Sequence, residues 1–210
     1  MLEIGGLLPF TTIDYPGNLA AVLFCQGCPW RCGYCHNRHL MTQTSRSPVY
    51  WHEVSALLRQ RRGLLDALVF SGGEPTLQEE LPDAIRAVRT MGFKVGLHTA
   101  GPYPERLREC IPLLDWVGMD LKAPFDEYER ITGIPGSGAA AQESAMLLRQ
   151  SGLAHQFRTT LDPFLYEGGR IKAMQQMVEG WGETLVLQQQ SPYYFLSARN
   201  GQEQPERGRW

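Results

Sequence analysis

The sequence predicts an α/β fold, a partial (β/α)6 barrel in which six parallel strands alternate with helices. Two observations support this fold. Short and nearly continuous apolar runs, typical of strands buried on both faces, recur along the chain. Between them lie segments with apolar residues at a helical period, several of which end at glycine. With 210 residues, 43% of them hydrophobic, the chain is long enough for one domain with a sizeable core.

The elements are expected in a simple order. The first 18 residues contain several Gly and Pro residues, so we expect a lead-in with a turn at Pro16-Gly17. Strands are expected at 19–25, 67–71, 94–98, 116–121, 156–161 and 184–188. Helices are expected near 48–63, 76–92, 104–110, 139–150 and 169–179. Thr76 is expected to cap the second helix, with Glu79 as its capping-box partner. The core domain is expected to span residues 1–196, followed by a loose polar tail at 197–210.

Composition narrows the classes of function. The formal net charge is −2 and no basic stretch indicates binding to nucleic acid. No run of 18 apolar residues indicates a membrane span, and the N-terminus lacks the features of a signal peptide. Five cysteines, an odd number with four in one loop, do not resemble a secreted disulfide framework. These observations predict a protein of the reducing cytoplasm.

Four of the five cysteines lie in one loop after the first buried strand, at Cys25, Cys28, Cys32 and Cys35. The last three have the spacing C-x3-C-x2-C. A zinc site would normally use two separated pairs of ligands, and a ferredoxin would supply a fourth cysteine, so both are disfavoured. Three close thiolates suit a [4Fe–4S] cluster with one iron that has no protein ligand. Cys25 at the strand end and the distant Cys110 are expected to be structural.

The loop resembles the signature of the radical S-adenosylmethionine (radical SAM) enzymes, with an aromatic residue, Tyr34, before the last cysteine. Cys-x-Tyr-Cys-His-Asn at 32–37 resembles the branch that activates glycyl radical enzymes. Thr-Ile-Asp-Tyr-Pro-Gly at 12–17 resembles the anaerobic ribonucleotide reductase activating proteins within that branch. The resemblance covers roughly residues 5–192 and implies a partial (β/α)6 barrel. It also implies that Cys28, Cys32 and Cys35 bind the cluster, and that the open iron chelates S-adenosylmethionine.

The same resemblance implies further contacts with S-adenosylmethionine. Gly72, Gly73 and Glu74 match the Gly-Gly-Glu-Pro motif of the family; glycines permit close approach of a ligand, and the exposed carbonyls of the turn and the Glu74 carboxylate suit its ammonium group. The alternative is an ordinary strand-to-helix turn. Asp120 and Lys122 lie two residues apart at a strand end and face the same side. Lys122 suits the methionine carboxylate and Asp120 the ribose or sulfonium region, although an isolated pair of this kind would usually be a surface pair.

Three more residues are expected near the cofactor. Tyr34 lies within the cysteine loop, Thr99 follows the third strand, and Gln188 ends the sixth strand, where it could hydrogen-bond the ribose. Arg158-Thr159-Thr160 end the fifth strand, and for these residues and Gln188 a position as polar residues at the rim of the barrel is an equally good interpretation. Related activating enzymes carry Asp at the position of His98, in a monovalent-cation site. Histidine is a poor ligand for such an ion, so this departure puts a cation site in doubt.

The predicted function is therefore the generation of a glycyl radical on a partner enzyme, with anaerobic ribonucleotide reductase favoured. Residues 36–70 contain no cysteine, whereas some activating enzymes insert a ferredoxin-like segment there, so we expect one cluster. The expected cofactors are this [4Fe–4S] cluster and S-adenosylmethionine, with flavodoxin or ferredoxin as electron donor. Two alternatives stay open: a radical SAM enzyme acting on a small molecule, as 7-carboxy-7-deazaguanine synthase does, and a non-catalytic iron–sulfur electron carrier.

Overall fold

A single seven-stranded sheet organises the molecule, as seen in a computed structural model that describes residues 2–42 and 49–189. The strands lie in the sheet in chain order. The first pair is antiparallel and every other pair is parallel. The strands are β1 (Ile4–Thr11), β2 (Ala20–Cys25), β3 (Ala67–Gly72), β4 (Lys94–Thr99), β5 (Trp116–Asp120), β6 (His155–Thr160) and β7 (Val186–Gln188).

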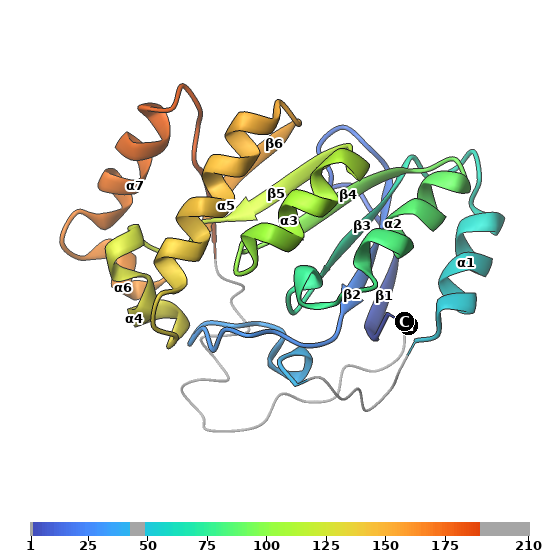
Figure 1. Cartoon of the computed structure of the whole chain (residues 1–210), viewed down its shortest axis with the longest axis horizontal. Helices are drawn as coiled ribbons and strands as arrows, with labels where there is room; N and C mark the ends of the chain where they lie inside the picture. Colours follow the sequence, from blue (N-terminus) through green and yellow to red (C-terminus); the bar gives the residue numbers. More distant parts are fainter. Residues whose placement is uncertain (1, 43–48, 190–210) are drawn as a thin grey trace.

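Helices follow the strands and lie against one face of the sheet (Figure 1). The α-helices are α1 (Trp51–Gln60), α2 (Leu81–Thr90), α3 (Pro104–Cys110), α4 (Tyr128–Thr132), α5 (Ser137–Ser151), α6 (Pro163–Tyr166) and α7 (Arg170–Glu179). Short 3-10 turns are η1 (Arg38–Leu40), η2 (Pro75–Leu77), η3 (Ile111–Leu113) and η4 (Phe125–Glu127). The six predicted parallel strands are all present, which confirms the α/β class and the open, partial barrel. The expected domain boundary and tail lie outside the described residues.

The lead-in predicted for the first 18 residues is wrong over residues 4–11, which form the edge strand β1, whereas the turn predicted at Pro16-Gly17 is present and is closed by a hydrogen bond from the Asn18 N–H to the Tyr15 carbonyl at 3.0 Å. The two glycines and Pro9 of β1 had suggested a segment without a strand. Proline is tolerated in a strand at the edge of a sheet, where its missing N–H group leaves no ladder bond unmade. The register between β1 and β2 shifts between Leu8 and Thr11, on either side of Pro9. The proline therefore marks an irregularity within the strand and does not end it.

The helix predicted from Thr76 also begins later than expected. Residues 75–77 form only the single turn η2, and α2 starts at Leu81 with Pro82 in its first turn. Thr76 does not form the expected capping box; instead its backbone N–H donates to the carboxylate of Glu74. Helices α4 and α6, of five and four residues, were not expected. They are too short to show a helical period in the sequence.

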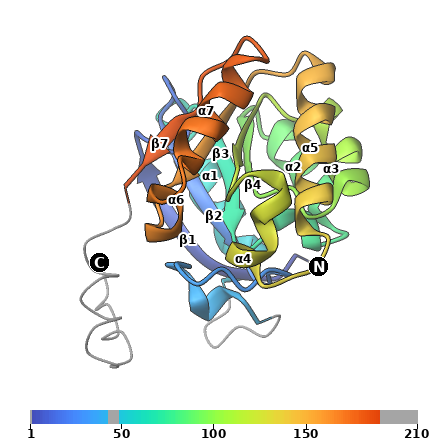
Figure 2. The same cartoon turned by 90° about the vertical axis from the view of Figure 1, so that its left-hand side faces the viewer.

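The two faces of the sheet differ in what they bury. The convex face packs on the helices through large apolar side chains such as Phe70, Leu97 and Phe157. On the concave face, the amino-terminal halves of the strands are covered by Tyr15, whose ring stacks on Trp116 with centroids 5.2 Å apart. The sheet curves between its edge strands β1 and β7 (Figure 2). The carboxyl-terminal half of the concave face lies beyond this apolar cover, and polar side chains from the strands gather there.

Candidate functional site

A cavity of about 170 Å³ lies at the carboxyl ends of the strands, between the sheet and the cysteine loop. Nearly all of the predicted site residues line it, although they are far apart in the sequence. The lining residues are Cys28, Trp30, Cys32, Tyr34, Cys35, His36, Asn37, Ser71, Gly72, Gly73, Glu74, His98, Thr99, Ala100, Asp120, Lys122, Arg158 and Thr160. Gln188 is not among them: it is half-buried beside Thr160, at the end of β7.

The cysteine loop is held in place by backbone hydrogen bonds. Gly27 donates to the carbonyl of Leu40 at 2.7 Å, and the N–H of Arg31 donates to the carbonyl of Thr132 at the end of α4, at 2.8 Å. This fixed backbone presents the thiols of Cys28, Cys32 and Cys35, all half-buried, to the one cavity. Cys25 and Cys110 are instead 0% and 1% exposed in the apolar core, as expected for structural residues.

The thiols of this loop are suitable ligands for an iron–sulfur cluster. Burial raises the pKa of the Cys28 thiol to about 12, and it also raises the pKa of Cys32. Both are therefore neutral thiols in the protein alone, and a bound metal would displace their protons, because the thiolate is the ligand form. Within the described residues, no three His, Cys, Asp or Glu side chains are grouped to hold a single metal ion. A cluster has separate irons, so its three thiolates need not meet at one point.

The glycines of the Gly-Gly-Glu turn are required by the cysteine loop that lies against them. A Cβ on Gly72, which has φ of +117°, would lie 2.4 Å from the backbone nitrogen of Cys25. A Cβ on Gly73 would lie 2.1 Å from the carbonyl oxygen of Gly27. The turn also donates hydrogen bonds from Gly73 to Cys25 and from Glu74 to Gly27, at 2.9 and 2.8 Å. Contact with the chain's own backbone thus requires both glycines, and the close approach of a ligand that was expected at this turn stays a prediction.

The carboxylate of Glu74 is 1% exposed and accepts four hydrogen bonds from the protein. Its donors are the N–H and hydroxyl of Thr76, the hydroxyl of Thr99 and the N–H of Ala100, at distances of 2.6–3.1 Å. Burial raises its pKa, although these donors act in the opposite direction. Glu74 and Thr99 therefore tie the end of β3 to the end of β4. Of the two acceptors expected for the ammonium group of the cofactor, Glu74 is thus already hydrogen-bonded within the protein, and the other is the set of backbone carbonyls of the turn.

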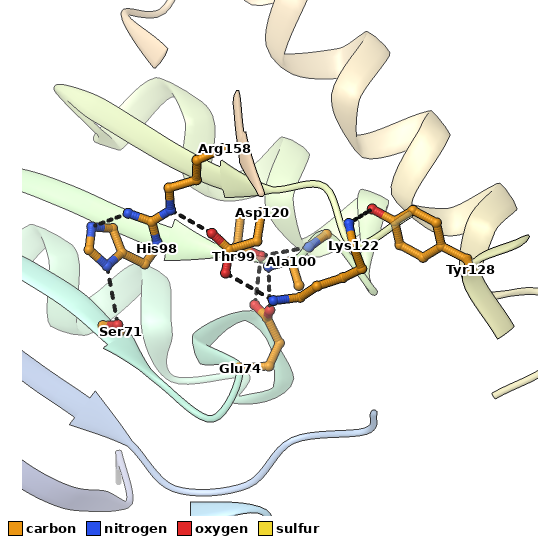
Figure 3. Close-up of polar contacts among 10 residues, drawn as sticks. Ser71, Glu74, His98, Thr99, Ala100, Asp120, Lys122, Tyr128 and Arg158 are labelled. Atoms are coloured by element: carbon orange, nitrogen blue, oxygen red, sulfur yellow. Dashed lines mark hydrogen bonds and ion pairs between the residues drawn. The ribbon is translucent and has the colours of Figure 1, made fainter. Parts of the chain in front are cut away.

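A second polar network crosses β4, β5 and β6 (Figure 3). The Asp120 carboxylate accepts a hydrogen bond from Lys122 Nζ at 3.0 Å and another from Arg158 Nε. Arg158 also reaches His98, whose Nε2 lies 3.1 Å from the guanidinium and 2.8 Å from the carbonyl oxygen of Asp14. The other ring nitrogen of His98 lies 3.3 Å from the Ser71 hydroxyl. Through Asp14, these contacts link the cavity to the segment between β1 and β2, which covers the amino-terminal half of the concave face.

Charges in this network stabilise one another. Burial alone would raise the pKa of Asp120, but the Arg158 and Lys122 cations outweigh it and hold that pKa well below its usual range. Burial alone would lower the pKa of Lys122, and the Asp120 carboxylate raises it well above the usual value. Burial and the nearby Arg158 lower the pKa of His98 to about 4, so the ring is neutral at pH 7. The cavity thus holds an ionised Asp120 between two cations.

Arg158 is the functional candidate that sequence reasoning placed only at the rim. The available signal was strand register: Asp120 and Arg158 are direct partners on the parallel strands β5 and β6. Tyr34 is placed as expected. Its ring centroid is 5.6 Å from Lys122 Nζ, and its buried hydroxyl has no hydrogen-bond partner among the described residues. The aromatic residue of the loop therefore covers the cation that is expected to meet the cofactor.

Comparison with known proteins gives a family for this arrangement. Residues 22–175 match the model of the radical SAM superfamily. The chain belongs to the radical SAM superfamily. Enzymes of this family use a [4Fe–4S] cluster and S-adenosylmethionine, and the donor set described above fits both. The resemblance predicted from the cysteine loop and the residues that follow it is confirmed.

Relatives within the superfamily include enzymes that activate glycyl radical enzymes. The chain is 32% identical over 170 residues to a candidate glycyl-radical enzyme activating enzyme of Methanocaldococcus jannaschii, covering 76% of this chain and 68% of that protein. It is 32% identical over 127 residues to the pyruvate formate-lyase-activating enzyme of Clostridium pasteurianum, covering 58% of this chain and 53% of that enzyme. The chain thus spans about half to two thirds of these relatives.

The fold has solved counterparts as well. SuiB of Streptococcus suis, solved in complex with its precursor peptide SuiA, matches with a TM-score of 0.64 at 15% identity. The match covers 81% of this chain and 38% of SuiB, and it supports the fold alone. Among the helices of residues 2–42 and 49–189, none is long and apolar enough to cross a membrane.

Proposed function

We propose that this protein is a radical SAM activating enzyme that generates a glycyl radical on a partner enzyme, with anaerobic ribonucleotide reductase as the favoured partner. One observation carries the proposal: the three thiols of the C-x3-C-x2-C loop and the Asp120–Lys122 pair line the same cavity. Similarity to activating enzymes supports the reaction class. The choice of ribonucleotide reductase rests on the resemblance of residues 12–17.

Each side chain has a role in this proposal. Cys28, Cys32 and Cys35 would hold the cluster, which would supply the one electron needed to cleave the S–C5′ bond of S-adenosylmethionine, with methionine as the other product. The Lys122 ammonium, oriented by Asp120, binds the methionine carboxylate. Carbonyls of the Gly72–Gly73 turn accept hydrogen bonds from the methionine ammonium. Thr99 is a further proposed contact of S-adenosylmethionine. Gln188 is another, provided that the bound ligand extends to β7.

Glycine suits the proposed reaction for physical reasons. It has no side chain to block approach, and its backbone permits a sharply turned loop to enter the cavity. The 5′-deoxyadenosyl radical takes one hydrogen atom from the α-carbon, which yields 5′-deoxyadenosine and a radical delocalised over the adjacent amides. We also propose a flavodoxin or ferredoxin as donor, no nucleic-acid or membrane partner, and a cytoplasmic location, in keeping with the chain's charge and cysteine pattern.

The test is an anaerobic mixture of reduced protein, S-adenosylmethionine and candidate glycyl radical enzymes. Electron paramagnetic resonance should show a glycine-centred doublet on the partner, with one 5′-deoxyadenosine formed per radical. A doublet on ribonucleotide reductase but not on pyruvate formate-lyase supports the favoured partner, and the reverse result rejects it. Absence of the doublet on every partner, with 5′-deoxyadenosine formed only when a small molecule is added, supports the small-molecule alternative. Absence of any 5′-deoxyadenosine supports an electron carrier.

A further inference from the structure

Charged residues are unevenly distributed around the cysteine loop. The chain has 22 Asp and Glu among its 210 residues, yet none lies between Tyr15 and His52. This stretch of 38 positions contains the whole loop, and it carries Arg31, Arg38 and Arg46. At the average density of the chain it would hold about four acidic residues. In a chain with a net charge of −2, the stretch of sequence that contains the cysteine loop therefore carries positive charge only, whereas the acidic residues near the thiols, Glu74 and Asp120, lie on the cavity side.

The structure places two of these arginines on the outside of the loop. Arg31 and Arg38 are both exposed. Arg31 donates from one terminal nitrogen to the carbonyls of Cys28 and Trp30, at 2.7 and 3.0 Å, and Arg38 donates to the carbonyl of Gly33 at 2.7 Å. Both guanidinium groups thus lie against the backbone of residues 28–33, on the exposed surface of the loop that carries the thiols. An arginine has five N–H groups, so each can hold the loop and still meet an anionic partner.

Gly33 lies between the second and third cluster cysteines and is exposed. Its φ is not in the left-handed region, and a Cβ built there would meet no atom of the described residues within 4 Å. Neither backbone conformation nor packing within the described chain explains a glycine at this position. The absence of a side chain at this exposed position leaves only backbone between the half-buried Cys32 and the Tyr34-Cys35 pair.

We propose that this outer face, defined by Arg31, Gly33 and Arg38, is the docking surface for an acidic electron-carrier protein of the flavodoxin class. The inference rests on the proposed function, which requires an electron to reach the cluster. Positive charge around the loop complements an acidic carrier, steers its approach and sets its orientation. Because Gly33 has no side chain, the carrier's cofactor can approach the backbone between the cysteines closely. One electron leaves the reduced carrier and is taken up by the bound cluster, and no bond or proton moves.

The experiment uses the cluster-loaded protein and an acidic flavodoxin as the probe. Affinity for oxidised flavodoxin is measured by titration at low and high salt. The rate of cluster reduction by reduced flavodoxin is then followed by anaerobic stopped-flow absorbance, with dithionite as a small reductant for comparison. The variants are Arg31→Glu with Arg38→Glu, the milder Arg31→Gln with Arg38→Gln, and Gly33→Trp. The matched control is Arg59→Glu, on the exposed side of α1. Iron content shows that each variant keeps its cluster.

The double charge reversal should weaken flavodoxin binding roughly tenfold or more at low salt, and the deficit should shrink at high salt because exposed charges are screened. If the reversed protein loses iron, the double Gln variant should show a smaller deficit of the same kind. Gly33→Trp should slow reduction by flavodoxin and leave reduction by dithionite unchanged. Wild-type affinity and salt dependence in an iron-loaded double variant, or an equal loss in Arg59→Glu, would overturn the proposal. No measurement needs a glycyl radical partner, so failure here is distinct from failure of the proposed function.

Discussion

A Cβ atom at position 73 would lie 2.1 Å from the carbonyl oxygen of Gly27 and 2.9 Å from that of Leu40. Both neighbours are backbone atoms of the cysteine loop, so they cannot rotate away as a flexible side chain would. Gly73→Ala should therefore push the loop off β3, cost about 2 kcal/mol or more of unfolding free energy, and lower the iron content. Urea unfolding and anaerobic iron analysis measure the two effects.

Gly6→Ala provides the control for that substitution. Its added methyl group would meet only the Phe24 side chain, at 3.6 Å, which is an ordinary van der Waals distance. Its φ is not in the left-handed region. Gly6→Ala should therefore keep a full complement of iron and nearly wild-type stability. Full iron and wild-type stability in Gly73→Ala would show that the loop moves more freely than these contacts imply.

The five cysteines divide into two groups that substitution can separate. Replacing Cys28, Cys32 or Cys35 by Ala should each abolish the oxygen-sensitive cluster, because each removes one of three thiolate ligands. Cys25→Ala and Cys110→Ala should retain it, since both side chains are buried in the apolar core. Iron and sulfide analysis after anaerobic reconstitution tests this. Two clusters per chain, or full iron in Cys32→Ala, would contradict the assignment.

At the scale of elements, the register of β5 against β6 brings Arg158 to Asp120. Arg158→Gln would leave the partly buried Asp120 carboxylate with Lys122 as its one cationic partner in the network. We expect a loss of roughly 1–3 kcal/mol in unfolding free energy, between the values for exposed and for buried ion pairs, with weaker binding of S-adenosylmethionine. Arg158→Lys should recover part of the affinity because it restores the charge but not the fork of donors. Urea unfolding and anaerobic ligand titration give both quantities.

A surface ion pair supplies the comparison. Arg86 and Asp83 on α2 lie 2.6 Å apart, with side chains 58% and 85% exposed. Solvent screens such a pair, so Arg86→Gln should change stability by less than about 1 kcal/mol and leave ligand affinity unchanged. Equal losses of unfolding free energy in Arg86→Gln and Arg158→Gln would show that the Asp120 network contributes no more to stability than a surface ion pair.

Elements and site residues were predictable to different degrees. The parallel strands could be predicted from their apolar runs, because both of their faces are buried. Strand β1 could not, because its glycines and Pro9 are unusual in a strand and its extended conformation depends on pairing with β2. The family resemblance and the place of these residues at the carboxyl ends of strands were enough to bring the three ligand cysteines, Asp120 and Lys122 together, and all of them line one cavity. Resemblance and strand position were not enough for Arg158 and His98, whose contacts depend on strand register, or for Glu74, whose carboxylate is satisfied by Thr76, Thr99 and Ala100.

At the scale of the whole molecule, the segment between β1 and β2 covers the amino-terminal half of the concave face. Tyr15 stacks on Trp116, and the carbonyl of Asp14 lies 2.8 Å from Nε2 of His98. His98 lies in turn against Arg158, which holds Asp120 at the cavity. Protonation of this one buried ring would therefore disturb the contact between the covering segment and the site.

The titration of His98 should be detectable in the pH dependence of the unfolding free energy. The charged groups around the ring are the Arg158 guanidinium, which lowers its pKa together with burial, and Asp120 and Asp14, which act in the opposite direction. With a folded pKa of about 4 and an ordinary value of 6.5, the unfolded chain binds the proton more readily. His98 should therefore favour the folded state fully above pH 6.5, and this contribution should be lost progressively as the pH falls toward 4. Between pH 7 and 5 the expected loss is roughly 2 kcal/mol.

Urea unfolding of the protein at pH values from 7 to 4.5 measures this loss. His98→Gln removes the titrating group, so its stability should fall less than that of the wild type over this range, even if it starts lower. His52→Gln, on the exposed side of α1, should follow the wild-type curve. Asp120 contributes in a separate window: its lowered pKa stabilises the folded state above about 4, and that contribution is lost only at more acid pH. Parallel curves for wild type and His98→Gln between pH 7 and 4.5 would show that His98 is not the group that couples proton uptake to unfolding.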